Sequence, residues 1–170
     1  SEDVKTDPVG WEKKKYLSQR GITAKNIHVD RKGNLIGVVF EGVARENTGI
    51  YVSFSFDGGT SFINPVKIEE FKYVISNNPR IAISTKGQIY VSWHVLSEDE
   101  SHSSIYYASS EDMGATWSDP KNISFGMQME IVPEPAFDNR DRLHLFFTSY
   151  SGGSFNLFHN STLVTLTFST

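Results

Sequence analysis

The sequence predicts an all-β fold made of repeated antiparallel sheets, and two observations carry that prediction. The first is a pattern that occurs three times along the chain: an apolar strand, a tight polar turn and an aromatic-rich strand. The second is its spacing, because the turn residues Gly33, Gly87 and Asp141 are separated by 54 residues each time (87 − 33 and 141 − 87). Units of about fifty residues with four strands each are typical of the blades of a β-propeller.

The strands of each unit are marked by β-branched and aromatic residues between clusters of Gly, Asn, Asp and Ser. No segment has a convincing helical period. We expect strands at 26–30, 35–40, 50–54 and about 62–68 in the first unit, at 80–84, 89–93, 105–109 and about 117–123 in the second, and at 134–138, 143–147, 155–159 and 163–168 in the third. The predicted blades therefore span about 26–70, 79–124 and 134–170, and the segment 10–18 resembles the outer strand of a preceding blade.

Three blades are too few to close a ring, because propellers usually have four to eight blades and closure removes exposed sheet edges. Three explanations stay open at this point. The chain is a fragment of a longer enzyme, a half-ring that pairs with a second copy to give six blades, or one part of a chain whose other blades are not included. A segment such as 10–18 could complete a blade of another copy, which favours the first two.

Composition excludes several classes of protein. The 170 residues are 38% hydrophobic and carry a formal net charge of −4, so we expect neither a disordered tail nor a basic surface for nucleic acid. No apolar run is long enough to span a membrane. There is no cysteine, and the histidines show no metal-ligand spacing, so we expect no metal and no cofactor. The N-terminus has no apolar signal core, so either the protein is not exported or its signal has been removed. The compartment stays open, and of the two alternatives we expect an extracellular or periplasmic protein whose signal has been removed.

Two turns share a sharper motif, the octet S-x-D-x-G-x-[S/T]-[W/F], at 55–62 and at 110–117. In such a turn the Asp carboxylate can accept hydrogen bonds from backbone N–H groups, and the Gly can adopt a positive φ. The terminal aromatic side chain can then pack between sheets. We therefore expect a structural role for the octet residues Ser55, Asp57, Gly59, Phe62, Ser110, Asp112, Gly114 and Trp117.

Two such octets at blade spacing resemble the Asp-box (bacterial neuraminidase) repeat of sialidase-like propellers, over about residues 10–158. The resemblance implies a six-bladed ring with a ligand site on the face opposite the octet turns. It also implies a glycoside hydrolase that holds a carboxylate with three arginines and uses a Tyr nucleophile, an assisting Glu and an Asp acid/base. The chain departs from this set. Only Arg80 stands where such an arginine could lie, and Tyr73 and Glu130 are the nearest Tyr–Glu candidates.

The repeat also predicts where a site would form. Seven residues before the three turn positions stand Asn26, Arg80 and Glu134, which we expect to begin the innermost strands and to face the central axis at one level. Two roles are open for Arg80, a clamp for an acidic ligand or a structural residue that bonds loop carbonyls or pairs with Glu134. We expect His28 to be a packed inner-strand residue. The candidate ligand-binding residues are Asn26, Tyr73, Arg80, Glu130 and Glu134.

Two functions follow from these observations. The first is a non-catalytic module that binds a glycan or a protein through its loop face, with a homodimer as one way to complete the ring. The second is part of a sialidase-like glycoside hydrolase whose catalytic residues are completed by other blades. The missing arginine pattern and the lack of a convincing carboxylate pair favour the first.

Overall fold

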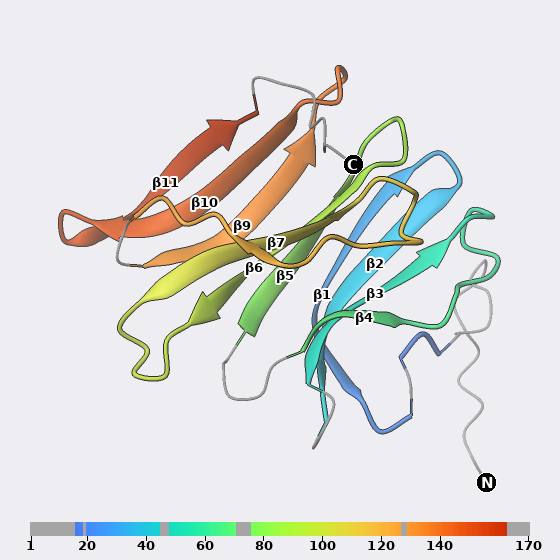
Figure 1. The fold of residues 1–170 in the computed structure, drawn as a ribbon, viewed down its shortest axis with the longest axis horizontal. Coiled ribbons are helices and arrows are strands. Elements are labelled where there is room, and N and C mark those ends of the chain that lie inside the picture. Colours follow the sequence, from blue (N-terminus) through green and yellow to red (C-terminus); the bar gives the residue numbers. More distant parts are fainter. Residues whose placement is uncertain (1–15, 19, 45–47, 71–75, 127–128, 163–170) are drawn as a thin grey trace, which may run out of the picture.

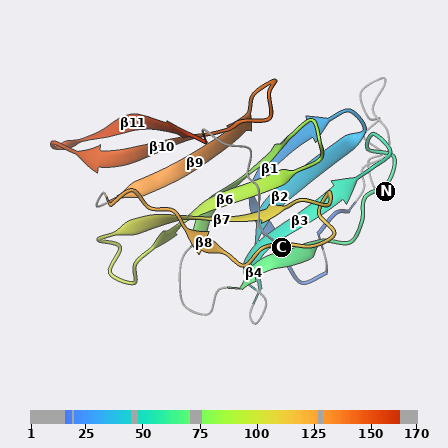
Figure 2. The ribbon, with the colours of Figure 1, turned by 45° about the horizontal axis from the view of Figure 1, so that its top comes forward.

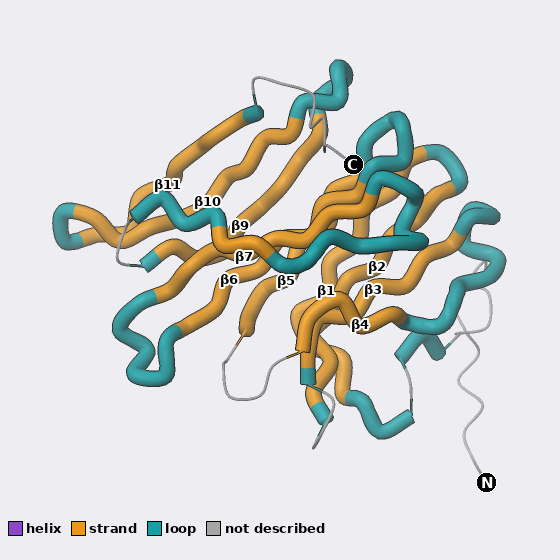
Figure 3. Tube along the Cα trace, viewed as in Figure 1, coloured by secondary structure: helices purple, strands orange, loops and turns teal. Residues whose placement is uncertain are grey.

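The protein consists of antiparallel sheets set side by side, as shown by a computed structural model that describes residues 16–18, 20–44, 48–70, 76–126 and 129–162 (Figures 1 and 3). These residues form eleven strands in three sheets, and the predicted all-β propeller fold is confirmed. The described residues form no helix, so none of them could cross a membrane as one.

Each sheet is one blade, with its strands in chain order. Blade 1 contains β1 (Thr23–Lys32), β2 (Leu35–Val43), β3 (Gly49–Ser55) and β4 (Val66–Glu70); blade 2 contains β5 (Ser76–Ile83), β6 (Ile89–Leu96), β7 (Ser103–Ser110) and β8 (Lys121–Asn122); blade 3 contains β9 (Glu130–Phe137), β10 (Leu143–Ser151) and β11 (Ser154–Ser161). The fourth strand predicted at 163–168 lies outside the described residues.

The first strand of each blade is the innermost. β1 contacts β5 and β5 contacts β9, whereas β4 and β8 lie at the outer edges of their sheets. Figure 2 shows the three sheets fanned about these inner strands. We call the end of the blades that carries the β2–β3, β6–β7 and β10–β11 connections the loop end, and the opposite end, which carries the octets, the turn end.

Every inner strand contains a bulge near the loop end. The pairing register shifts between Lys25 and His28 in β1, between Asn77 and Arg80 in β5, and between Ile131 and Glu134 in β9. Inside each bulge one residue has a positive φ: Asn26 (49°), Asn78 (53°) and Val132 (53°). His28, Arg80 and Glu134 are therefore structurally equivalent, each being the first paired residue after its bulge.

The predicted equivalence of Asn26 with Arg80 and Glu134 is wrong. The first hairpin turns through two residues, since Lys32 pairs directly with Leu35. The second and third turn through three, with Ser84 bonded to Gln88 and Asp138 to Arg142. Gly33 and Gly87 consequently do not occupy the same position, and counting back from them misplaces the first blade by two residues.

Blades 1 and 2 pack through a fully buried apolar layer. Blade 1 contributes Val39, Ile50, Val52 and Phe54, and blade 2 contributes Ile81, Ile83 and their neighbours. Gly37 makes the close approach possible, because a Cβ at that position would lie 2.7 Å from the Cδ1 of Ile81.

Side chains also join the inner strands of these two blades. The backbone N–H of Ile81 donates to Nδ1 of His28 (3.3 Å), and that of Ile83 donates to Oδ2 of Asp30 (2.7 Å). These donors point away from their own sheet partners and are buried, so an unpaired N–H would be costly. In β9, Pro135 stands at the position equivalent to Ile81.

The octet turns close on themselves at the turn end. Asp57 accepts the backbone N–H (2.9 Å) and the hydroxyl (2.7 Å) of Ser61, and Asp112 accepts the same two groups from Thr116 (2.8 and 2.6 Å). The two hydrogen bonds from Thr116 are the main reason that the pKa of Asp112 is lowered to about 2.

The octet of blade 2 also reaches its neighbour. Trp117 stacks on Phe54 of blade 1 (ring centroids 6.3 Å apart) and donates its Nε1 proton to the carbonyl of Gly114. Gly114 has a φ of 91°, and a Cβ there would lie 2.5 Å from the Phe54 ring. A glycine is therefore required on both conformational and steric grounds.

Candidate functional site

Polar and ionisable side chains from all three blades gather near the loop end of the inner strands. His28, Arg80 and Glu134 follow the three bulges, and Asn26 lies within the first of them. Glu41 and His94 stand at equivalent positions near the ends of β2 and β6. We call Asn26, His28, Glu41, Arg80, His94 and Glu134 the inner-strand cluster.

Glu134 joins the three blades. Its Oε2 accepts a hydrogen bond from Nε of Arg80 at 2.7 Å, and its Oε1 lies 3.1 Å from Nε2 of His28. The residues equivalent by fold thus interact directly, a cation and an imidazole from blades 2 and 1 sharing one carboxylate from blade 3.

His28 is held as the neutral imidazole. Its Nδ1 accepts the N–H of Ile81, so the ring proton resides on Nε2 and is donated to Glu134. Burial lowers the pKa of His28 below its ordinary value, and the Arg80 charge adds to that effect while Glu134 opposes it. The ring therefore serves as a structural bridge at neutral pH.

His94 is more deeply buried, at 4% exposed. Burial, with a further contribution from the nearby Arg80 charge, lowers its pKa to about 4. Its Nδ1 lies 3.4 Å from the backbone N of Val132, which donates to it. His94 is therefore neutral under most conditions and links blade 2 to the bulge of blade 3.

Arg80 has both structural and solvent-facing parts. Its Nη1 donates to the carbonyl of Pro79 at 3.1 Å and its Nε to Glu134. Its Nη2 forms no hydrogen bond with any residue that the structure describes. The side chains of Arg80, His28 and Glu134 retain 20%, 27% and 46% of their exposure, so these three members of the cluster are accessible to solvent.

Asn26 has a different partner from the one its predicted role implied. Its Nδ2 donates to Oε2 of Glu41 at 2.8 Å, within blade 1. The amide thus bonds the carboxylate of a residue that is only 8% exposed. Asn26 therefore flanks the Arg80–Glu134–His28 group instead of matching it.

The other two candidate residues lie apart from this group. Glu130 is fully buried, and both of its carboxylate oxygens accept the backbone N–H of Phe125 (2.7 and 2.9 Å). This contact anchors the connection into β9. Tyr73 lies outside the described residues, so the geometry of a Tyr73–Glu130 pair stays a prediction.

Val132 marks the site by its backbone. A φ of 53° is unusual for a β-branched residue, whereas asparagine, found at the equivalent bulge positions 26 and 78, tolerates it. Such strain costs about 1 to 3 kcal/mol and tends to occur where surrounding structure holds it in place. Here the N–H of Val132 is held by His94.

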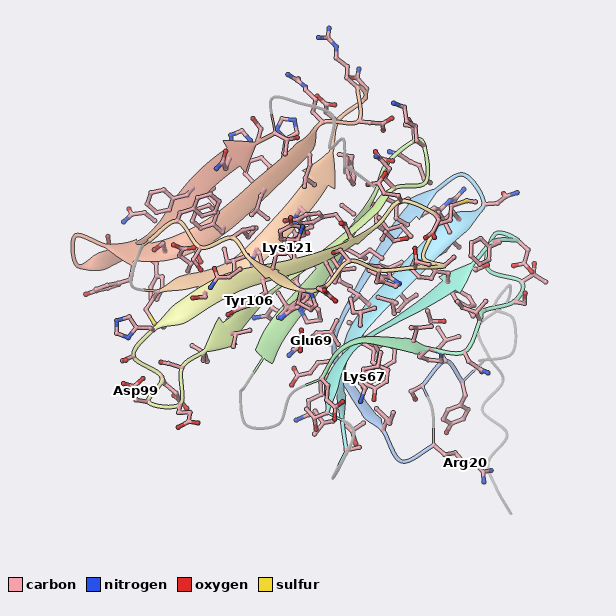
Figure 4. The ribbon with its side chains drawn as sticks, viewed as in Figure 1. Arg20, Lys67, Glu69, Asp99, Tyr106 and Lys121 are labelled. Atoms are coloured by element: carbon pink, nitrogen blue, oxygen red, sulfur yellow. The ribbon has the colours of Figure 1, made fainter. Side chains whose placement is uncertain are left out.

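The part of the chain that the structure describes offers no set of ligands for a metal ion. Among the described residues, no three His, Cys, Asp or Glu side chains are grouped so that they could hold an ion. In the acidic β6–β7 loop, Asp99 lies at the tip (Figure 4) and its oxygens accept the hydroxyls of Ser97 (2.6 Å) and Ser101 (2.7 Å). The loop is thus locked by its own side chains.

The candidate site predicted from the sequence did not include His28, Glu41 or His94. A signal for His28 was present, because Asn26-Ile27-His28 and Asn78-Pro79-Arg80 place an asparagine two residues before the site residue in both strands. Glu41 and His94 carried no such signal, since their roles depend on strand pairing and on packing between blades.

Comparisons with known proteins identify the fold. No protein-family model matches the sequence, and no curated protein matches it significantly. Among solved structures, a PL25 ulvan lyase superposes with a TM-score of 0.62 at 14% sequence identity, over 82% of this chain and 41% of the lyase. The same lyase was also solved bound to -[GlcA(1-4)Rha3S]- with the same scores.

Two further structures agree. A GH43 enzyme from Xanthomonas citri, complexed with xylose, has a TM-score of 0.54 at 10% identity over 74% of this chain and 40% of its own. An α-L-arabinanase from Penicillium chrysogenum, complexed with arabinobiose, has a TM-score of 0.51 at 13% identity over 75% and 41%. The chain spans about two fifths of each. At these identities the likeness establishes the shared propeller fold.

Proposed function

We propose that the chain is a non-catalytic module that binds a glycan at the loop end of its blades, through the inner-strand cluster. The observation that carries the proposal is the Arg80–Glu134–His28 group. Three blades contribute one side chain each at one structural level, and all three remain open to solvent.

The chemistry of the group suits a polyhydroxylated ligand. The Nη2 of Arg80, which bonds none of the residues that the structure describes, can donate to sugar oxygens or to a carboxylate or sulfate group of the ligand. Glu134 can accept hydrogen bonds from ligand hydroxyls. The solved structures of the same fold support a glycan as the ligand class, since their bound molecules are an oligosaccharide of glucuronate and sulfated rhamnose, xylose and arabinobiose.

The pairing within the cluster favours binding over catalysis. Both oxygens of Glu134 and both ring nitrogens of His28 already have partners, and the Glu41 carboxylate is held by Asn26. A general base must be able to accept a proton from the substrate. Glu134 already shares its two oxygens with Arg80 and His28, and its remaining lone pairs suit it to accept a hydrogen bond from a sugar hydroxyl.

Calorimetric titration with defined oligosaccharides tests this function. The panel includes uronate-containing, sulfated and sialylated oligosaccharides together with neutral xylo- and arabino-oligosaccharides. We expect binding by the wild type and at least a tenfold loss of affinity for Arg80→Met. Arg142→Met is the matched control, because Arg142 is an exposed arginine that also pairs with a carboxylate, Asp138, but at the turn end.

Two results would contradict the proposal. One is no binding to any member of the panel, or equal loss in both arginine variants. The other is turnover: cleavage of a fluorogenic sialoside, or of any oligosaccharide in the panel, by the wild type but not by Glu134→Gln would show that the cluster is catalytic and would favour the hydrolase alternative.

A further inference from the structure

Blade 3 presents an apolar face to solvent on the side away from blade 2. Phe146 and Tyr150 on β10 and Phe155 and Leu157 on β11 are all exposed. The cross-strand pairs Tyr150–Phe155 and Thr148–Leu157 place them on one side of the sheet. We call Phe146, Tyr150, Phe155 and Leu157 the trailing face.

The same positions are buried in the other two blades. Leu157 pairs with Thr148 as Ile50 pairs with Glu41 and Ile105 with His94, so the three residues are equivalent. Leu157 is 72% exposed, whereas Ile50 and Ile105 are at 0%. In blades 1 and 2 this surface is covered by the next blade.

Blade 1 shows the complementary defect on its opposite side. Val29 is equivalent to Ile81 and Pro135, since each follows the first paired residue after its bulge. Val29 is 52% exposed. Ile81 is only 1% exposed, because it packs on the preceding blade. Ile27, equivalent to the buried Pro79, is exposed too. We call Ile27 and Val29 the leading face.

The leading and trailing faces are the two halves of the interface that already occurs twice within the chain. We propose that they bind each other between two copies, blade 3 of each copy packing on blade 1 of the other. One chain carries both halves, so two copies related by a two-fold axis bury both pairs of faces at once. Three blades from each copy give six, within the range in which propellers close.

The segment before β1 fits this arrangement. Leu17 and Ile22 pack against Val38, Phe40 and Tyr51, on the outer part of blade 1 on the same side as Val29. They lie where the outer portion of a neighbouring blade would pack. The part of blade 1 left exposed is the inner part, which the β9–β10–β11 sheet of a second copy would cover.

The arrangement has a consequence for the cluster. Ring closure would place two copies of His28, Arg80 and Glu134 about one central axis. The inference goes beyond the proposed glycan binding and does not depend on it, because the two faces carry none of the cluster residues.

The first experiment is the solution mass of the chain, measured by light scattering after size exclusion without any glycan. We expect twice the chain mass of 19.1 kDa for the wild type. Leu157→Glu and Val29→Glu should each weaken dimerisation at least tenfold. Met113→Glu, which charges an exposed apolar side chain on the octet turn of blade 2, should remain dimeric.

A second experiment tests the orientation without burying a charge. In the blade 1–blade 2 interface, Gly37 lies against Ile81. The equivalent pair between copies is His144 and Val29. Because the chain has no cysteine, mixing the single variants His144→Cys and Val29→Cys should give a disulfide-linked heterodimer in preference to either homodimer.

A wild type that stays monomeric up to about 100 μM overturns the proposal and would mean that further blades of a longer chain cover these faces. Homodimeric disulfides as abundant as the heterodimer would also overturn it. Neither result bears on glycan binding, which is measured separately with the Arg80 and Arg142 variants.

Discussion

The octet turns and the inner strands use the same kinds of side chain in opposite ways. In an octet, the Asp carboxylate bonds residues four positions away, so the turn is complete within its own hairpin. In the inner strands, His28, Asp30 and Arg80 bond groups 53 or 54 residues away, in a different blade. Local bonds stabilise one blade, whereas the long-range bonds define how blades meet and create the candidate site.

The largest expected effect tests the contrast between local and long-range contacts, because the second octet also contacts Phe54 of blade 1. Gly114→Ala should lower the free energy of unfolding by about 4 kcal/mol, since it adds a methyl group into the Phe54 ring at a positive φ. Gly59→Ala is the matched variant: it occupies the same octet position, with a φ of 98° and an ordinary 3.5 Å contact to Ile36.

Gly59→Ala should cost only about 1 kcal/mol, for backbone strain alone. Urea denaturation of both variants measures the difference. Equal losses would mean that the second octet is as self-contained as the first.

His94 gives the next effect, and it is specific to the inner region. The pKa falls from 6.5 to about 4 on folding, so the unfolded chain binds a proton that the folded chain does not over that range. The contribution of neutral His94 to the free energy of unfolding is therefore fully present above about pH 6.5 and is lost as the pH drops toward 4. Each pH unit costs about 1.4 kcal/mol, or about 3 kcal/mol in total.

Unfolding free energies at half-unit steps from pH 7 to pH 4 would measure this slope. His94→Gln should remove most of it, while the smaller contribution of His28 remains. A wild type with no slope above pH 4 would contradict the assignment of His94 as a buried neutral imidazole.

Asp30 tests the link between blades at a single donor. Asp30→Ala leaves the buried N–H of Ile83 without its acceptor and should cost about 2 kcal/mol. Asp30→Asn keeps an oxygen at the same place and should cost less than half as much, as measured by urea denaturation. Equal costs would indicate that charge, and not the hydrogen bond, is what Asp30 supplies.

The smallest effect is a gain. Val132→Asn should raise the free energy of unfolding by about 1 kcal/mol, because asparagine tolerates the positive φ that valine resists. The same variant measures whether the strained bulge matters to the site. Unchanged glycan affinity with higher stability would show that the strain has no role in binding.

The sequence was most informative where structure depends on neighbours in the chain. The octets at 55–62 and 110–117 and the first three strands of each blade follow from local pattern, and the strands were found where expected. The second strand of each hairpin was identified within a few residues. The outer strands were less well defined: β8 has two residues, because its pairing is decided by contact with β7 and not by composition.

The cluster depended on properties that the repeat concealed. Arg80 and Glu134 were identified as inner-strand residues because their two hairpins have turns of equal length. His28 was expected on the inner strand but not at the level of Arg80 and Glu134, since the first hairpin has a turn shorter by one residue and its Gly33 does not stand at the position of Gly87. His94 and Glu41 enter only through packing between and within blades, which no spacing in the sequence records.

Pro135 has a consequence for how the site could arise. The residue at its position in blade 2, Ile81, has an N–H that must be bonded, and His28 of the preceding blade supplies the acceptor. Pro135 has no N–H, so the blade 2 residue equivalent to His28 does not have to accept a hydrogen bond from blade 3. That residue is Arg80, which could not have accepted a hydrogen bond. Because Pro135 needs no hydrogen-bond acceptor, the position of Arg80 in β5 does not have to supply one. A cationic side chain can therefore occupy a position at which the fold would otherwise require an acceptor.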